Sequence, residues 1–211
     1  MPVPLDLNLD VNVRGSVTFG GSIFSLTRTK IQQEDLSEFN IPIEDWRIWN
    51  AYQTLLTGTA NTDDLAITAV AFGTGTPYIS CGDVNADASA TRYARFQVQL
   101  PMNYVAGETV QIRFYAGLFS GTAAIGTITV DLEAYETGAT TGALVNSVDL
   151  CATSAITINS LTFAACDFTI TPTALVAGDM LDCRVAINFS NDATARVPAI
   201  LYAKLLCDTK G

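Results

Sequence analysis

Two short stretches place oxygen-bearing side chains at alternate positions, the spacing with which an EF-hand calcium loop begins. They are Asp6, Asn8 and Asp10 near the start of the chain, and Asp83, Asn85 and Asp87 further along. An EF-hand loop also requires glycine at its sixth position and an acidic residue at its twelfth. Valine or alanine stands at these positions instead: Val11 and Val17, then Ala88 and Ala94. We therefore predict no metal and no cofactor, and only the second stretch stays open as a calcium loop of another kind.

Histidine is absent from the 211 residues. Its absence removes the commonest general base, the Ser–His and Cys–His nucleophile pairs, and histidine-ligated zinc. The five cysteines are widely spaced and include no Cys-x-x-Cys pair: Cys81, Cys151, Cys166, Cys183 and Cys207. That spacing fits neither a disulfide framework nor a zinc knuckle, so we expect them to be small buried hydrophobic residues. No catalytic residue is identified, and the chain is predicted not to be an enzyme.

Both tryptophans lie in one short segment, Trp46–Leu56. The positions of Trp46, Trp49 and Tyr52 are close to helical spacing, which predicts a short amphipathic helix. Because tryptophan dominates cores and interfaces, the first interpretation is packing in the core or against another subunit. The alternative is an exposed aromatic platform for a sugar, to which Tyr78 would contribute.

The chain is acidic, with 11 Lys plus Arg against 21 Asp plus Glu and a formal charge of −10. Such a surface repels a phosphate backbone, so no nucleic-acid partner is expected. No apolar run approaches the ~18 residues that span a bilayer, and residues 1–10 lack the pattern of a secretory signal. We therefore expect no membrane partner and a reducing compartment.

The first residues alternate strictly between apolar and polar side chains. The apolar positions are Val3, Leu5, Leu7, Leu9, Val11 and Val13. A period of two predicts an extended strand with one apolar face, which is either the first strand of the domain or an arm that pairs with another subunit. Residues 1–44 are interpreted as an extended N-terminal arm and connector. The acidic segment 32–45, at the boundary with the next domain, is interpreted as a connector or a single helical turn.

Beyond residue 63 the same alternation recurs in several segments separated by Gly, Pro and Asn. The clearest are residues 93–100, 109–115, 127–135 and 180–189; shorter or fully buried ones are 65–72, 143–148, 155–158, 166–170 and 199–206. Each alternating segment has one dry and one wet face, as in antiparallel sheets that pack on one side only. We predict an all-β protein whose residues 45–211 form an antiparallel β-sandwich of the jelly-roll type with about eight strands.

A series of motifs runs through the middle of the chain. It comprises Trp46-x-x-Trp49, Leu55-Leu56, Asp63-Asp64-Leu65, Pro77-x-Ile79, Thr91-Arg92-Tyr93-Ala94-Arg95-Phe96, Leu100-Pro101-x-Asn103-Tyr104-x-x-Gly107, Ile112-Arg113-Phe114-Tyr115-Ala116-Gly117 and Val130-Asp131-Leu132-Glu133-Ala134-Tyr135. Together, over about residues 43–135, these motifs resemble jelly-roll structural proteins of tailed bacteriophages. They are strand and turn patterns, and the last third of the chain departs from the resemblance.

The resemblance implies a virion protein made in the host cytoplasm, most like a head decoration (cement) protein. Such a protein sits as a homotrimer on the outer capsid surface and binds the major capsid protein. The residues predicted to make these contacts are Leu5, Leu7, Leu9, Val11 and Val13 in the arm, with Trp46, Trp49 and Tyr52 as interface anchors. Two alternatives stay open: a carbohydrate-binding module, and a fibre, tail or baseplate β-sandwich.

Overall fold

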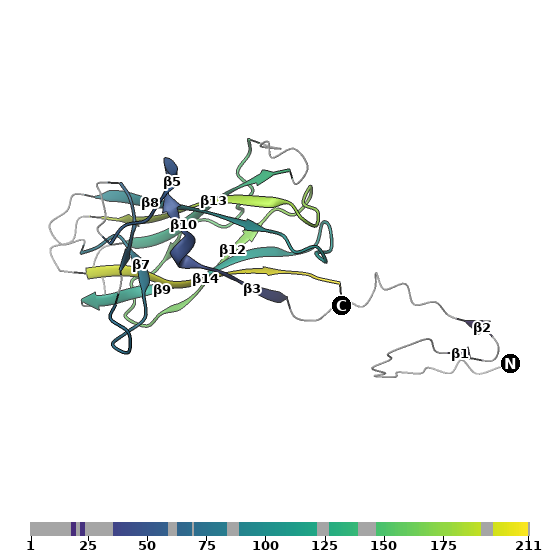
Figure 1. Cartoon of the computed structure of the whole chain (residues 1–211), viewed down its shortest axis with the longest axis horizontal. Coiled ribbons are helices and arrows are strands. Elements are labelled where there is room, and N and C mark those ends of the chain that lie inside the picture. Colours follow the sequence, from purple (N-terminus) through teal and green to yellow (C-terminus); the bar gives the residue numbers. More distant parts are fainter. Residues whose placement is uncertain are drawn as a thin grey trace.

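The computed structural model describes residues 18–19, 22–23, 36–58, 63–68, 70–83, 89–121, 127–138, 147–190 and 196–210 (Figure 1). The predicted arm residues Leu5, Leu7, Leu9, Val11 and Val13 lie outside this part of the chain. Strands β1 (Thr18–Phe19) and β2 (Ser22–Ile23) pair with each other. Within the described residues, no helix is both long enough and apolar enough to cross a membrane.

Two antiparallel sheets make up the rest of the described chain. Sheet I has the order β11 (Ile156–Thr157), β10 (Ile128–Thr137), β13 (Met180–Phe189), β8 (Ala90–Gln99), β4 (Arg47–Ile48) and β5 (Ala51–Leu55). Sheet II has the order β12 (Ala164–Ile170), β9 (Val110–Gly121), β14 (Arg196–Cys207), β7 (Tyr78–Ser80) and β6 (Ala66–Thr68), and β3 (Ser37–Ile41) also pairs with β14. The predicted all-β class is confirmed.

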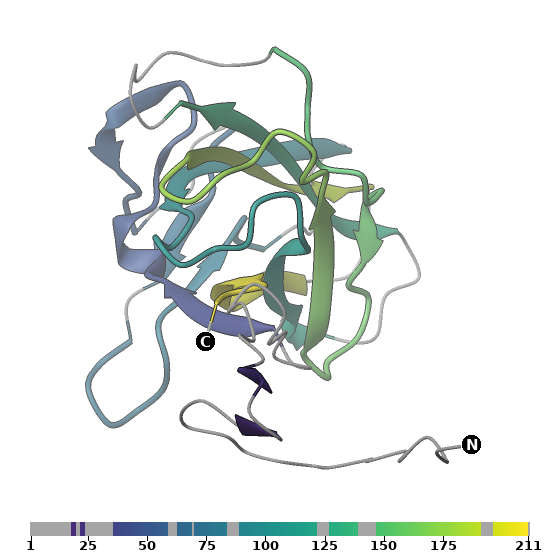
Figure 2. The same cartoon turned by 90° about the vertical axis from the view of Figure 1, so that its right-hand side faces the viewer.

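The strand order is that of a jelly roll. Numbered one to eight along the chain, strands β7 to β14 run 6-3-8-1 in sheet II and 5-4-7-2 in sheet I. Two interlocked Greek keys produce this order, because successive strands cross from one sheet to the other and return beside an earlier neighbour. Figure 2 shows the two sheets facing each other across the core. The predicted jelly-roll sandwich is therefore confirmed.

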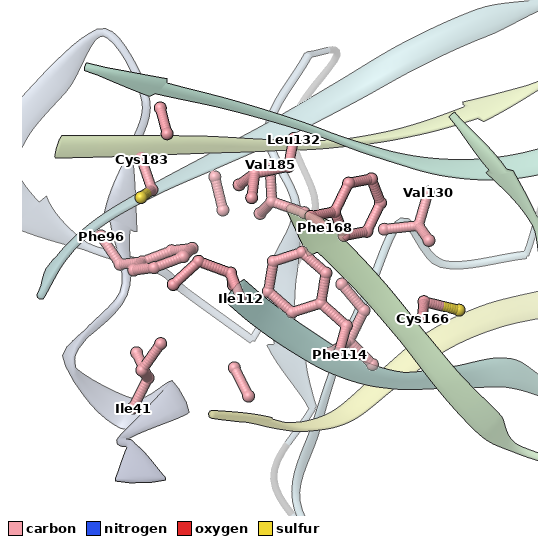
Figure 3. Packing of buried hydrophobic residues seen from close by; sticks show 14 of the residues in the cluster. Ile41, Phe96, Ile112, Phe114, Val130, Leu132, Cys166, Phe168, Cys183 and Val185 are labelled. Carbon is pink, nitrogen blue, oxygen red and sulfur yellow. The ribbon is translucent and has the colours of Figure 1, made fainter. Parts of the chain in front are cut away.

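The core is formed by the inward positions of the alternating strands. In β10 every second residue from Ile128 to Ala134 is buried, and β13 buries Leu181, Cys183, Val185 and Ile187 in the same way. Phe96 of β8 meets Phe114 of β9 edge to face at 6.2 Å across the core, and within sheet II Phe114 packs against Phe168 of β12 at 5.6 Å (Figure 3). The edge-to-face pair of Phe96 and Phe114 adds stability beyond the area that the two rings bury.

Two local predictions differ from the structure. The sequence predicts a connector or one helical turn over 32–45; a 3₁₀ turn is present at Ile43–Asp45, but Ser37–Ile41 before it is strand β3. The helix expected over Trp46–Leu56 is instead the hairpin β4–β5. Tertiary pairing outweighs the weak helical spacing, because β4 can pair with β8 only when it is extended.

Trp46 is a core residue. Its side chain is 0% exposed, stacks on Phe96 at 4.8 Å and meets the edge of Phe114 at 5.9 Å. Its indole N–H finds no hydrogen-bond acceptor among the described residues. A residue in this position cannot contact a partner or a sugar in the folded protein. Of the three aromatic anchors that the sequence suggested, only Trp49 and Tyr52 reach the surface.

We predict that Trp46→Ala destabilises the fold by about 3–5 kcal/mol, because it removes the ring that joins the two sheets and leaves a cavity. Trp46→Phe should cost much less, since it keeps the ring and deletes an N–H group that has no acceptor. Urea unfolding of both variants measures the difference. An alanine variant as stable as the parent protein would contradict the core assignment.

Glu136 is a buried acid at the end of β10, where its residue is only 4% exposed. Burial, and to a lesser extent the negative charge of Asp179, raises the pKa of the Glu136 carboxyl above its ordinary value. The folded protein therefore holds this proton up to a higher pH than the unfolded chain does. Above that range the folded state bears the cost of burying a charged carboxylate.

We predict that Glu136→Gln stabilises the protein at neutral pH, because glutamine has the shape of the acid and no charge. The gain should shrink as the pH falls towards 4.5, where wild-type Glu136 is also protonated in the folded state. Thermal unfolding of both proteins over that pH range measures the effect, with the exposed Glu44→Gln as the matched control. A difference that does not change with pH would rule out this cause.

Candidate functional site

The outward side chains of β10, β13 and β8 stand in cross-strand rows, set by the register of the two pairings. The rows, read in that strand order, are Tyr135–Asp182–Gln97, Glu133–Arg184–Arg95, Asp131–Ala186–Tyr93 and Thr129–Asn188–Thr91. We call this surface the sheet I face. Directly opposed side chains on neighbouring strands interact, so each row is a unit of contact.

The second row places two like charges opposite each other, since Arg184 is the direct partner of Arg95. Each guanidinium is neutralised by a different carboxylate. Arg95 donates from Nε to Asp182 Oδ1 at 2.7 Å and from a terminal nitrogen to Oδ2, while Arg184 donates to Glu133 Oε1 at 2.5 Å. The hydrogen bond to Asp182 raises the pKa of Arg95 above its ordinary value, although burial acts against it.

The β4–β5 hairpin brings two aromatic rings to these guanidiniums. The Arg184 guanidinium carbon lies 5.4 Å from the centroid of the Trp49 ring and 4.9 Å from that of Tyr93. The Arg95 guanidinium lies 4.8 Å from the Tyr52 ring. These distances are in the range of cation–π attraction. The rings and charges therefore fix one another's positions.

Two further hydrogen bonds complete this arrangement. The indole nitrogen of Trp49 donates to Asp63 Oδ2 at 3.3 Å, which holds the hairpin turn against the loop before β6. The hydroxyl of Tyr135 donates to Glu133 Oε2 at 3.2 Å. Burial, and next the charge of Glu133, raises the pKa of Tyr135, so its hydroxyl stays protonated and able to donate at neutral pH.

Two hollows lie on the sheet I face. The first has a volume of about 310 Å³ and is lined by Trp49, Arg95, Glu133, Tyr135, Asp182, Cys183 and Arg184. The second, about 340 Å³, lies at the other end of the rows and is lined by Ser89, Ala90, Thr91, Thr127, Thr129, Asn188, Phe189 and Ser190. The first combines aromatic rings with charged hydrogen-bonding groups, and the second is rich in hydroxyl and amide groups. The first can hold a polyhydroxylated ligand by hydrogen bonds and stacking, and the second by hydrogen bonds.

The sequence analysis found only part of this site. It singled out Trp49 and Tyr52, which the structure brings together on one face, and it missed Arg95, Arg184 and their carboxylates. A signal was present, because charged residues make up only 15% of the chain yet recur at the polar positions of alternating strands. Tyr78, the other suggested platform residue, lies in sheet II, where it is 8% exposed and stacks on Phe119.

The surroundings of the cysteines and of Asp83 in the possible calcium loop indicate structural roles. All five cysteines are free thiols, four of them buried and Cys151 half-buried. Burial raises the pKa of Cys151 and of Cys207 to about 11, so neither is a ready thiolate at neutral pH. Within the described residues no three His, Cys, Asp or Glu side chains gather as metal ligands. Asp83 accepts a hydrogen bond from the backbone of Arg196, whereas Asn85 and Asp87 lie outside the described residues.

No protein-family model matches the chain, and no curated protein does. Among solved structures, it is similar to a family 35 carbohydrate-binding module from Clostridium thermocellum, at 16% identity and a TM-score of 0.41, over 80% of this chain and 97% of that one. It is also similar to a putative sugar-binding protein from Bacteroides thetaiotaomicron, at 12% identity and a TM-score of 0.40, over 71% of this chain and 85% of that one. A third similarity is to a structure of infectious bursal disease virus, Gx strain, at 12% identity and a TM-score of 0.32, over 68% of this chain and 36% of that one. All three similarities are too weak to indicate a ligand, so the function has to be inferred from the site.

Proposed function

We propose that the protein is a β-sandwich binding module that holds an uncharged carbohydrate on the sheet I face. The observation that carries this proposal is the hollow of about 310 Å³, in which two paired guanidiniums, their carboxylates and the ring of Trp49 come together. Vicinal sugar hydroxyls both donate and accept hydrogen bonds, and carboxylate and guanidinium groups supply both partners. The apolar face of a sugar ring packs on aromatic side chains.

Charge favours a neutral sugar over an acidic one. On β8, β10 and β13, three outward carboxylates (Asp131, Glu133 and Asp182) accompany the two guanidiniums of Arg95 and Arg184. Both guanidiniums are already paired, and the whole chain carries −10. An acidic sugar would therefore have to displace a carboxylate from one of these guanidiniums, while a neutral glycan would exchange hydrogen bonds with groups that are already in place.

The paired state of the site also lowers the cost of binding. Long arginine side chains lose rotamer freedom when they are fixed by a ligand, at about 0.5–1.5 kcal/mol per side chain. Here ion pairs and rings fix both guanidiniums within the protein itself. That ordering is complete before a ligand arrives, so more of the contact energy remains for affinity.

A glycan array tests this function. We expect neutral oligosaccharides to bind and uronic-acid glycans not to bind, with little effect of salt on affinity because the ligand is uncharged. Trp49→Ala should weaken binding at the sheet I face about tenfold or more, which corresponds to ~1.4 kcal/mol or more. Phe72→Ala is the matched control, since that ring is fully exposed on a distant loop. Binding at the sheet I face that is unaffected by Trp49→Ala, or binding that favours acidic glycans, would contradict the proposal.

A second candidate function comes from the resemblance to tailed-phage structural proteins. Several of the motifs that carry it coincide with strands β8, β9 and β10 and the turn at 101–107, which belong to the jelly-roll sandwich, and the others lie at 46–56, 63–65 and 77–79. As a decoration protein it would form a trimer on the outer capsid surface and contact the major capsid protein. The arm residues expected to make those contacts lie outside the described part of the chain.

The copy number in purified particles tests this second candidate. A decoration protein is expected on the head in many copies, and a chain without residues 1–14 should stay folded but fail to bind heads. Quantitative mass spectrometry measures the copies, and a binding assay on undecorated heads measures the truncation. A few copies confined to the tail, or normal decoration by the truncated chain, would overturn it.

A further inference from the structure

A β-bulge in β14 turns one tyrosine out of the core. The pairing of β14 with β9 shifts register between Ile200 and Tyr202, so that Leu201 is an extra residue. Ile200 and Ala203 are both buried, at 0% and 1% exposure, whereas Tyr202 is 41% exposed. In a regular strand Tyr202 would share the inward face with Ile200. Bulges re-aim side chains in this way and are frequent beside binding sites.

The bulge places Tyr202 at the end of an aromatic ladder on the outer face of sheet II. The Tyr202 ring lies parallel to that of Tyr115, with a 4.9 Å separation and 5° between the planes, and Tyr115 stacks on Phe163 at 6.4 Å. At the other end of the ladder, Gly117 leaves room for Phe163, because a Cβ at Gly117 would lie only 3.1 Å from the Phe163 backbone. The Tyr202 ring is therefore oriented by its neighbours before any ligand binds.

A hollow of about 520 Å³ lies beside Tyr202, between β14 and the chain from β3 into the 3₁₀ turn. Its lining residues include Pro42 and Ile43 as apolar groups, and Asn40, Glu44 and Lys204 as polar ones. The volume is within the range of small-molecule sites, and amide, carboxylate and ammonium groups provide donors and acceptors. The Tyr202 ring beside these polar groups suits a ligand that has one apolar face and several hydroxyls.

The cations next to this hollow are already neutralised. Lys204 donates to Glu38, and Arg113 makes an ion pair with Asp167, with Glu38 at 3.7 Å. The interaction with Lys204 holds the pKa of Glu38 below its ordinary value, so Glu38 remains charged. An anionic ligand would have to displace one of these carboxylates, whereas an uncharged ligand leaves them in place.

We propose that the hollow beside Tyr202 is a second carbohydrate site, which binds one ring of an uncharged sugar against the aromatic ladder. It lies on sheet II, while the site proposed above lies on sheet I, so the two sites occupy opposite outer faces of the sandwich. Two sites on opposite faces make one chain bivalent. Because the two faces point away from each other, such a chain would bridge two glycan strands and would not engage one flat surface through both sites.

Saturation-transfer NMR on the full chain with cellobiose, maltose and lactose at millimolar concentration tests this. Tyr202→Ala and Trp49→Ala should each keep binding through the other site, and the double variant should bind at least about tenfold more weakly than either one. Tryptophan fluorescence should respond to sugar in Tyr202→Ala but not in Trp49→Ala. Tyr202→Phe keeps the stacked ring and should bind as wild type, and Phe72→Ala is the control for loss of an exposed ring.

The outcomes separate the two proposals. If Trp49→Ala alone abolishes binding, the second site is overturned and the sheet I site stands. If Tyr202→Ala alone abolishes binding, the second site stands and the sheet I site is overturned. Wild-type protein that binds none of the three sugars overturns the second site for these ligands and leaves the glycan array to decide the first. Thermal unfolding of Tyr202→Ala checks that any loss of binding is not a loss of fold.

Discussion

The two sheets stay together only while both inner faces exclude water, and this constraint governs the rest of the molecule. It requires every second residue of the long strands to be apolar and to meet a side chain of the opposite sheet, as Phe96 meets Phe114. Because adjacent residues of a strand point to opposite faces, the residues between the inward-facing ones face the solvent. Arg95, next to Phe96 in β8, is such a position. The core and the proposed binding surface thus arise from the same alternation of inward and outward residues.

On the sheet I face, several of the outward positions carry charged residues. Their ion pairs orient the neighbouring side chains more than they stabilise the fold. A solvent-exposed ion pair contributes only about 0–1 kcal/mol, and both guanidiniums here are about a third exposed. These ion pairs allow two arginines to lie directly opposite each other, and the paired guanidiniums hold Trp49 and Tyr52 over the sheet. The short β4–β5 hairpin joins sheet I by a single described residue pair with β8, so these ring contacts add to its attachment.

The sheet II face has a different chemistry because its central strand is irregular. Strand β14 is bordered by β9 on one side and by β7 and then β3 on the other, and it accommodates this change of neighbour with two register shifts. The second shift exposes Tyr202 and creates the aromatic ladder. Both faces carry ion pairs, but guanidiniums meet aromatic rings on sheet I, whereas rings stack on one another on sheet II. The two surfaces that we propose as binding sites therefore differ in chemistry.

The sequence by itself determined the fold class, the principal strands and the burial of most cysteines, because each follows from residue type and a period of two along the chain. It also identified Trp49 and Tyr52, since aromatic side chains are conspicuous in a chain with 9% aromatic residues. It mistook the β4–β5 hairpin for a helix, because a few residues fit both periods and only pairing with β8 excludes one of them. Only the tertiary structure decided that Trp46 belongs to the core, that Arg184 of β13 meets Trp49, and that an extra residue in β14 exposes Tyr202. These three facts depend on strand register and on contacts between residues distant in sequence, which local periodicity does not encode.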